Sequence, residues 1–475
     1  MKYAALGNRI NGASIPFDGE HLKVLSPVDG SLLSQVPLSR PSELDAAVAS
    51  AAAAFENWSS QTIKDRSQVF FRYRSLLAQH FDELAQCVHE ENGKTLDEGR
   101  GEVAKAIEVT EFACSLPQLT AGEVLEVSPG VECRVDHTPV GVVASITPFN
   151  FPIMVPHWTI PIALCLGNSF ILKPSEKVPL SADRTAELLR EAGLPDGVFN
   201  VVHGDRTVVA AICDHPQIAA VSFVGSTPIA KTVYVRAAAN LKRVLAMGGA
   251  KNHLVALPDA DVQQTAVNVT ASMSGCAGQR CMAAASLVAV GDVEAIIEAI
   301  CGEARRVVPG ETLGAVISRE AKERIENLIT EAERSGAAIL VDGRGATVAG
   351  CEGGFYVGPT IIDHVRPDMR IAQEEVFGPV LAIIRAQDID EAIAIENASP
   401  YGNAAAVYTR DGKAARDFIG RASAGMIGIN IGVPVPREPF GFGGWNDSRF
   451  GVGDITGKSS IGFWTQSKKV TSRWN

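Results

Sequence analysis

Short apolar runs alternate with helical patterns from about residue 138 onward. The runs lie at 140–147, 169–174, 198–203, 218–224 and 241–246, and each leads through a turn signal into a helix-like segment. Continuous apolar strands are typical of a parallel sheet that is covered by helices on both faces. Right-handed crossovers then predict a doubly wound sheet with a nucleotide site at the carboxyl ends of its strands.

A second alternation extends from about residue 252 to residue 430. After an apolar run at 252, its strand candidates are 286–290, 338–341, 359–362, 379–385 and 404–408. Helical patterns at 259–274, 294–306, 319–335 and 388–398 separate them. This arrangement predicts a second α/β domain.

The chain begins with helical patterns and ends with a strand-like tail. Residues 41–58 and 63–112 are rich in Ala, Leu, Glu and Arg with helical spacing, which suits helices packed on the first sheet. The tail 461–474 resembles a strand at a chain end, and such a strand often pairs with another subunit. Oligomerisation is therefore expected.

Length and charge narrow the class of protein. The 475 residues correspond to two or three domains at roughly 100–200 residues each. The formal charge is 43 − 54 = −11, without a basic stripe, so nucleic acid is not an expected partner. Apolar stretches such as 159–167 are shorter than the ~20 residues of a membrane span, and the N-terminus shows no secretory pattern. We therefore expect a cytoplasmic enzyme without a membrane partner.

The nine cysteines do not indicate a metal site or a disulfide framework. They are scattered, with neither a CxxC pair nor a Cys/His pair at zinc spacing, so no metal is predicted. Most are expected to be buried small hydrophobic residues. Cys281 differs because it lies in the Gly/Ala-rich segment 275–284 directly after Arg280, whose charge could lower the pKa of the thiol or hold an acidic substrate.

Four other segments carry polar or acidic groups, and the first three of them follow strand candidates. Asn150 could aim an amide N–H at an oxyanion, or it could cap the next helix. Lys173 and Glu176 (KPSE) lie where a nucleotide ribose would bind, or in a surface turn, and Gly225 opens a helix where backbone amides could bind a pyrophosphate. The segment EEVFGP (374–379) combines an acid with an aromatic ring. Taken alone, each segment is also compatible with a purely structural role.

Together the segments resemble one family. The order FNFP, KPSE, FVGST, GQRC, EEVFGP, YGNAAAV and PFGFGGW resembles the aldehyde dehydrogenase superfamily over essentially the whole chain. The segments MGGAKNH and AGQRCMA and the tail FWTQSKKVTSRW are similar to those of the methylmalonate-semialdehyde dehydrogenases, which acylate coenzyme A. The resemblance implies an aldehyde dehydrogenase-like α/β fold with an NAD domain, a catalytic α/β domain and a small oligomerisation element.

The resemblance also implies residue roles and domain limits. Cys281 matches the nucleophile, and Asn150 with the backbone N–H of Cys281 matches the oxyanion hole. Cofactor contacts are implied for Thr147, Pro148, Phe149, Lys173, Glu176, Gly225, Ser226, Glu375 and Phe377, with the Glu176 carboxylate favouring NAD over NADP. The implied NAD domain is 1–119 with 139–250, the catalytic domain is 251–430, and the oligomerisation strands are 120–138 and 455–475.

One departure concerns the general base. Hydrolytic members of the superfamily carry a glutamate where this chain has Met247, although Lys251 is retained. Without that base a thioester on Cys281 would persist, and coenzyme A could take the acyl group. The alternative is that another acid activates water, which would give a free carboxylic acid.

A second departure concerns the substrate. In the methylmalonate-semialdehyde group an arginine helps to hold the substrate carboxylate, and here Lys105 takes its place. Lysine keeps the charge but cannot form a bidentate contact. Since Arg280 also lies beside the nucleophile, we expect a small acidic aldehyde such as malonate or methylmalonate semialdehyde. The sequence thus predicts NAD-dependent, coenzyme-A-acylating oxidation by a homodimer or homotetramer, and a non-catalytic scaffold protein is the alternative of another class.

Overall fold

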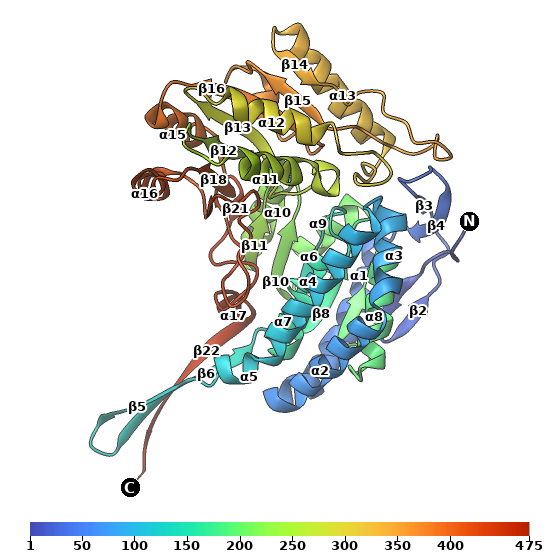
Figure 1. Cartoon of the computed structure of the whole chain (residues 1–475). Coiled ribbons are helices and arrows are strands. Elements are labelled where there is room, and N and C mark those ends of the chain that lie inside the picture. Colours follow the sequence, from blue (N-terminus) through green and yellow to red (C-terminus); the bar gives the residue numbers. More distant parts are fainter. Residues whose placement is uncertain (475) are drawn as a thin grey trace.

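Two large sheets form the framework of the computed structural model, which describes residues 1–474 (Figure 1). The first sheet has the order β2-β1-β9-β8-β7-β10-β11-β21, and its five central strands from β9 to β11 are parallel. The strands are β1 (Asn8–Ile10), β2 (Ala13–Ile15), β7 (Val142–Ile146), β8 (Ser169–Lys173), β9 (Phe199–Val201), β10 (Ile218–Val224), β11 (Arg243–Met247) and β21 (Arg449–Phe450). The five central strands lie where the apolar runs predicted them.

Helices cover both faces of the first sheet. Because side chains alternate along a strand, Val143 of β7 packs on one face, whereas Val142 and Ala144 pack in a separate core on the other. The first core includes α2 (Ile63–Gln79), α3 (Phe81–Asn92), α4 (Leu96–Cys114), α7 (Ile160–Cys165) and α8 (Leu180–Glu191), and the second includes α1 (Pro41–Ser60), α9 (Arg206–Asp214) and α10 (Thr227–Ala239). The expected doubly wound arrangement is confirmed.

The second sheet has the order β14-β15-β16-β13-β12-β18-β19 and is parallel except between β14 and β15. Its strands are β12 (Asn252–Ala256), β13 (Ala284–Val290), β14 (Ala338–Val341), β15 (Thr360–Asp363), β16 (Val380–Ala386), β18 (Ala404–Tyr408) and β19 (Met426–Ile429). Its helices are α11 (Val262–Ser274), α12 (Glu294–Ala304), α13 (Arg319–Arg334), α14 (Arg370–Gln373), α15 (Ile389–Asn397) and α16 (Gly412–Arg421). The second α/β unit is therefore confirmed.

A three-stranded antiparallel arm projects from the body at the lower left of Figure 1. It consists of β5 (Glu123–Ser128), β6 (Val131–Pro139) and β22 (Thr465–Arg473), with β6 in the middle. The strand expected over 461–474 is wrong for residues 461–464, which belong to the helix α17 (Ser460–Trp464). Ile461 and Trp464, three positions apart, are both buried in the first core, and a helical turn places such a pair on one side.

Two small strands connect the C-terminal region to the first sheet and to the short strand that precedes β18. Strand β20 (Trp445–Asn446) pairs with β17 (Tyr401–Gly402), and β21 pairs with β11. Between them the buried hydroxyl of Ser448 donates to the carbonyl of Gly249 (2.7 Å) and accepts from the N–H of Gly402 (3.2 Å). We call residues 445–450 the strap.

The remaining elements are short. A hairpin is formed by β3 (His21–Leu25) and β4 (Leu32–Pro37), and two helices, α5 (Leu116–Leu119) and α6 (Met154–His157), complete the helical layer. Among residues 1–474 no helix combines the length and apolarity that a bilayer crossing requires.

Candidate active site

Cys281 lies on the wall between two cavities. One cavity, of about 510 Å³, is bounded by α4 and by residues 431–438, and we call it the α4 cavity. The other, of about 280 Å³, includes the end of β10, and we call it the β10 cavity. Cys281 and Trp158 line both cavities. A group bonded to the Cys281 sulfur is therefore reachable from two sides.

Two asparagines hold the backbone of Cys281. The side-chain amides of Asn252 and Asn403 donate to its carbonyl oxygen at 2.7 and 2.8 Å. Asn252 begins β12, and Asn403 lies between β17 and β18. Residues at the ends of second-sheet strands therefore fix the backbone of Cys281. Both asparagines lie in segments that carried the family resemblance, although sequence reasoning did not single them out.

A left-handed turn precedes Cys281. Cys276, Ala277 and Gly278 have φ values of 53°, 52° and 67° within a short 3-10 helix (Gly275–Gly278). A Cβ on Gly278 would lie 2.0 Å from the carbonyl oxygen of Gly378, so only glycine fits there. The turn therefore places the cysteine loop against the segment that contains Glu375 and Phe377. Cys276 itself is buried beside it and lines neither cavity.

Burial, together with the nearby Glu375 carboxyl, raises the pKa of the Cys281 thiol to about 12. Arg280 lowers this pKa, as the sequence suggested, but the effect is outweighed. The Arg280 guanidinium donates to the carbonyls of Ala271 and Ser272 at 2.7 and 2.9 Å. The free protein thus holds Cys281 as a neutral thiol at pH 7.

Asn150 lies beside Cys281 at the β10 cavity. Its side-chain amide is buried and donates to the carbonyl of Gln279 at 2.9 Å, which leaves its second N–H for another acceptor. The alternative that Asn150 caps the next helix is wrong, because the N-cap of α6 is Ile153. The loop that follows β7 places Pro148, Phe149 and Asn150 together on the cavity wall.

Four more of the expected cofactor residues, Gly225, Ser226, Glu375 and Phe377, line the β10 cavity. Gly225 and Ser226 line it at the end of β10, where Ser226 is the N-cap of the 13-residue helix α10. Phe377 meets Phe149 edge to face at 5.8 Å between ring centroids. An anionic group at this wall would face the N-terminus of α10, which is the positive end of the helix dipole.

Glu375 faces a backbone turn of two glycines. The Ala250 N–H donates to its carboxylate at 3.2 Å, and a Cβ on Gly249 would lie 2.5 Å from Glu375 Oε2. Burial raises the pKa of Glu375 to about 7. It is the carboxylate of the β10 cavity, since the other lining residues there are neutral or, as for Arg324, basic.

Thr147, Lys173 and Glu176 lie at the ends of β7 and β8 but not in the lining of the β10 cavity. The Thr147 N–H donates to the carbonyl of Lys173 at 3.1 Å. The ammonium of Lys173 lies 3.2 Å from Glu176, whose side chain is 35% exposed. These ends are adjacent in the sheet, where the fold predicts the nucleotide site.

The two cations expected to bind a substrate carboxylate both line the α4 cavity, and both are already engaged. The Lys105 ammonium pairs with Glu108 at 3.0 Å and with Glu438 at 2.6 Å. The Arg280 contacts to backbone carbonyls were given above. Their role in substrate binding stays a prediction.

Met247 is buried at the end of β11, and its carbonyl accepts from the N–H of Gly225 at 3.1 Å. Lys251 donates to the carbonyl of Ile371 at 2.6 Å, and burial lowers its pKa to about 8. The Lys251 ammonium thus forms its hydrogen bond to a backbone carbonyl near Glu375, and Lys251 does not line either cavity.

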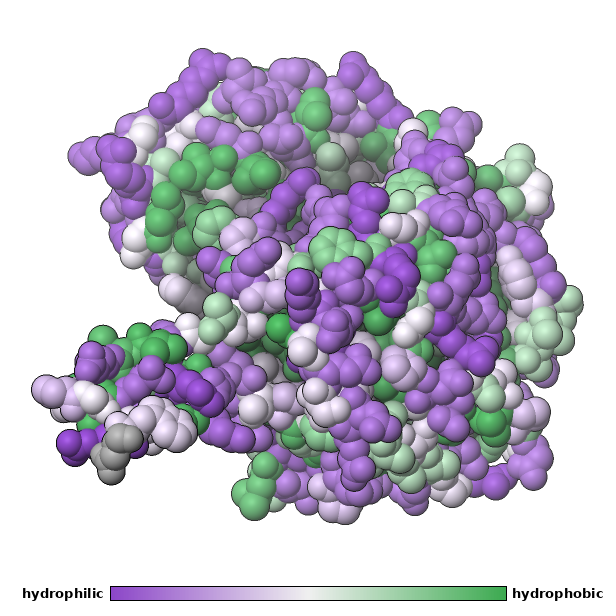
Figure 2. All heavy atoms as spheres, turned by 90° about the horizontal axis from the view of Figure 1, so that it is seen from below, coloured by the Kyte–Doolittle hydropathy of each residue, from purple (hydrophilic) through white to green (hydrophobic). Residues whose placement is uncertain are grey.

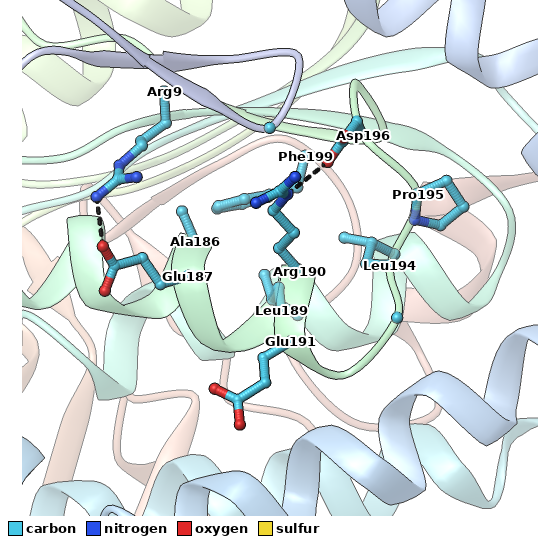
Figure 3. Close-up of a pocket in the computed structure, with 12 residues that line it drawn as sticks. Arg9, Ala186, Glu187, Leu189, Arg190, Glu191, Leu194, Pro195, Asp196 and Phe199 are labelled. Atoms are coloured by element: carbon cyan, nitrogen blue, oxygen red, sulfur yellow. Dashed lines mark hydrogen bonds and ion pairs between the residues drawn. The ribbon is translucent and has the colours of Figure 1, made fainter.

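A cavity of about 580 Å³ lies elsewhere, between the β1–β2 hairpin and α8 (Figure 3). Its charged side chains pair with one another, Arg9 with Glu187 at 2.6 Å and Arg190 with Asp196 at 2.9 Å (Figure 3). It contains neither Cys281 nor Asn150 and offers no nucleophile.

Sequence reasoning missed several residues of the site. Trp158 and Phe442 stack at 4.5 Å in the α4 cavity, and Arg324 of α13 lines the β10 cavity while donating to the carbonyl of Val376 at 2.6 Å. Phe442 lies in the segment PFGFGGW, but the local sequence does not show that these three residues meet at the site, because each reaches it through packing of distant elements. Among the described residues no group of three or more His, Cys, Asp or Glu side chains is placed to hold a metal ion.

Comparisons with known proteins agree over nearly the whole length. The model of the aldehyde dehydrogenase family matches residues 15–470. A malonate-semialdehyde dehydrogenase of Geobacillus kaustophilus is 45% identical over 99% of this chain and 98% of that protein. Among solved structures, a methylmalonate-semialdehyde dehydrogenase from Oceanimonas doudoroffii superposes with a TM-score of 0.98 at 42% identity, covering 100% of this chain and 99% of that one.

A second solved structure contains a nucleotide. A protein from Sinorhizobium meliloti 1021, assigned provisionally to the methylmalonate-semialdehyde dehydrogenases and complexed with NAD, superposes with a TM-score of 0.97 at 43% identity over 100% of this chain and 99% of that one.

Proposed function

Because the chain belongs to the aldehyde dehydrogenase family, we propose that it oxidises a small acidic semialdehyde with NAD and passes the acyl group from Cys281 to coenzyme A. Malonate or methylmalonate semialdehyde would give acetyl- or propionyl-coenzyme A, carbon dioxide and NADH. The names of the relatives support this substrate class. The observation that carries the proposal is the position of Cys281, beside Asn150 and between two cavities.

The chain's own groups suit attack on an aldehyde. Cys281, once deprotonated, adds to the carbonyl carbon and forms a tetrahedral oxyanion. The free N–H of the Asn150 amide and the backbone N–H of Cys281 would donate to that oxygen, and fixed donors in a closed cavity stabilise developing charge strongly. The rest of the aldehyde would occupy the α4 cavity, beside Lys105 and Arg280.

The β10 cavity suits the nicotinamide half of a dinucleotide and its pyrophosphate. The N-terminus of α10 with Gly225 and Ser226 suits a pyrophosphate, and Glu375 is placed to accept from a ribose hydroxyl. At the ends of β7 and β8, Glu176 would accept from the other ribose and repel a 2′-phosphate, which favours NAD over NADP. When bound, NAD supplies the hydride acceptor. Thr147, Pro148, Phe149, Lys173 and Phe377 would complete the contacts.

Met247 supports the acylating reaction. A hydrolytic enzyme needs a base that activates water against the thioester, and general-base assistance is worth roughly 10²–10⁴-fold. A buried methionine offers none. The thioester would therefore persist until the thiol of coenzyme A, which is a better nucleophile than water, attacks it.

A rapid-mixing experiment tests this function. With malonate semialdehyde and NAD but no coenzyme A, the protein should release about one NADH per active site and then slow at least ~10²-fold, because hydrolysis lacks its base. Coenzyme A should restore turnover, and NADP should support it poorly. Met247→Glu should raise the rate without coenzyme A. Steady wild-type turnover without coenzyme A, as fast as with it, would instead establish the hydrolytic reaction.

We also propose that the arm joins subunits into a homodimer or homotetramer and that the enzyme is cytoplasmic. Val124 and Leu125 of β5 are each 67% exposed, and Figure 2 shows the arm, with apolar side chains on its surface, standing away from the body. Exposed apolar side chains on a strand at a sheet edge favour pairing with another chain. The domain limits given above remain part of this proposal.

A further inference from the structure

A buried ion pair lies directly behind the candidate oxyanion hole. The Lys94 ammonium and the Glu102 carboxylate are 2.6 Å apart, and their side chains are 1% and 0% exposed. Lys94 comes just before α4, and Glu102 lies in the first half of that helix. Removing two charges from water is costly, and such a pair is a weak source of stability. Stability alone therefore does not explain the presence of this ion pair, and its other contacts indicate a second role.

The ion pair forms hydrogen bonds with the backbone at Asn150 and with the backbone just after it. The Lys94 ammonium donates to the carbonyl oxygen of Asn150 at 2.5 Å and lies 3.8 Å from the centroid of the Phe151 ring. The Glu102 carboxylate accepts from the N–H groups of Ile153 and Met154 at 2.7 and 3.0 Å. The peptide of Asn150 and the start of α6 are therefore held by one buried unit.

Neighbouring residues extend this support to the cysteine loop. Asn92, at the end of α3, donates to the carbonyl of Phe149 at 2.8 Å. Glu98 of α4 accepts from the N–H of Cys276, which opens the left-handed turn before Cys281. The α3–α4 segment thus contacts both backbone stretches that supply the two oxyanion donors, although neither Lys94 nor Glu102 lines a cavity.

We propose that Lys94 and Glu102 are positioning residues, which act on the reaction by fixing the orientation of the Asn150 amide. The inference rests on the proposed role of Asn150 in the oxyanion hole. The Asn150 side chain has one contact of its own, to Gln279, so its aim depends on where its backbone is held. A displacement of about 1 Å of a catalytic group can cost roughly 10²-fold in rate.

The test is a double-mutant cycle between this pair and Asn150. Lys94→Met with Glu102→Gln removes both charges together, so that no unpaired charge stays buried, and keeps an oxygen for the N–H groups of Ile153 and Met154. We expect the single-turnover rate of NADH formation to fall about 10- to 100-fold, while the Kd of NAD changes less than about twofold. Asn150→Ala alone should cost about 10²–10³-fold.

Combining the substitutions gives the decisive readout. In the Asn150→Ala background, the Lys94/Glu102 substitutions should slow the reaction less than about threefold further, because the group they position is gone. A merely structural role would multiply the two losses. Tyr73→Phe is the matched control: it removes a buried hydrogen bond to His157 of α6 (2.7 Å) without touching Asn150, and its rate should stay near wild type.

Each outcome separates the two proposals. If Asn150→Ala is as fast as wild type, the oxyanion role is wrong and this inference falls with it. If Asn150→Ala is slow but the Lys94/Glu102 variant is not, or if the losses multiply, only the positioning role is wrong. Should the double substitution not fold, Lys94→Arg replaces it, because this variant keeps the charge opposite Glu102. The proposal then requires that Lys94→Arg shows the same loss of rate without weaker NAD binding. It also requires that this loss is non-additive with that of Asn150→Ala.

Discussion

Cys281 has an environment that favours the neutral thiol, although the proposed chemistry needs the thiolate. Burial and the Glu375 carboxyl raise its pKa, and Arg280, the cation that lowers this pKa, donates to backbone carbonyls of α11. In the free protein the cysteine is therefore protected from reagents that attack thiolates. Its reactivity would depend on what binds beside it.

This environment predicts the pH dependence of alkylation. Because the pKa of Cys281 is raised to about 12, the thiolate is a small fraction at pH 7 and grows about tenfold for each pH unit. The rate of Cys281 modification by iodoacetamide in the free protein should rise in this way from pH 7 to pH 9 without reaching a plateau, as followed by mass spectrometry of the Cys281 peptide.

Glu375→Gln provides the control at the same site. It removes a negative charge that raises the Cys281 pKa, so alkylation at pH 8 should become a few-fold faster. A plateau below pH 8 in the wild type would contradict the neutral-thiol state.

At the residue scale, the sequence led to Cys281 and Asn150 because both lie in short segments with a recognisable order along the chain. It did not lead to Asn252, Asn403 or Lys94, whose contacts to the site span 29, 122 and 56 positions. Asn252 and Asn403 lie in segments that carried the family resemblance, but the local sequence does not show that a polar side chain binds a distant carbonyl. It also could not show that Lys105 is held by Glu438, which is 333 positions away.

At the scale of elements, the turn at 276–278 determines how the cysteine loop meets the segment 374–379. Three successive residues in the left-handed region are unusual, and for the two that are not glycine the backbone conformation costs about 1–3 kcal/mol each. Contacts on both sides compensate: Glu98 accepts from Cys276, and Gly278 packs on Gly378.

Gly278→Ala should therefore disable the enzyme. The new Cβ would overlap the carbonyl of Gly378 at 2.0 Å in a backbone conformation that alanine adopts poorly, so the turn must move and displace Cys281. We expect kcat to fall at least tenfold and the free energy of unfolding to drop by about 1–3 kcal/mol, measured by steady-state kinetics and urea unfolding.

Gly336→Ala is the matched control. Its φ of +95° carries the same backbone penalty, but no atom lies within 4 Å of the new Cβ. It should lose stability without losing kcat. Equal kinetic effects of the two substitutions would show that the turn does not position the cysteine.

Element prediction succeeded where a pattern repeats. The apolar runs gave β7 to β11 within a few residues, since strands buried on both faces leave a continuous hydrophobic signal. The N-terminal strands β1 to β4 went unrecognised because β1 and β2 have only three residues each, and β3 and β4 form a separate two-stranded hairpin outside the repeating alternation of strand and helix. In the tail, Trp464 packs into the first core as part of α17, which its strand-like neighbours do not reveal.

At the scale of the whole molecule, the arm projects from the body and one of its strands is exposed to solvent. Strand β5 is exposed along its whole length, and its partner is β6. An exposed strand at the edge of a sheet offers unpaired backbone groups to which another chain can bind.

Val124→Glu with Leu125→Glu should therefore reduce the oligomer to smaller species without unfolding the subunit, because both side chains are 67% exposed. Light scattering after size-exclusion chromatography measures the mass, and circular dichroism measures folding. Leu241→Glu, at a position 95% exposed outside the arm, should leave the mass unchanged. An unaltered mass in the arm variant would contradict the proposed assembly.

The strap limits how the two sheets can separate. Besides its pairing with β17 and β11, it is joined to the turn after β11, to α10 and to β17 by hydrogen bonds from Gly248 N–H to Ser448 O, Ser448 Oγ to Gly249 O, Gly402 N–H to Ser448 Oγ and Thr227 Oγ1 to Asp447 O. At about 1 kcal/mol each, these bonds add to the strand pairings in opposing separation of the two sheets. Nucleotide and thiol would exchange through the mouths of the cavities, with the inter-sheet angle nearly constant through the catalytic cycle.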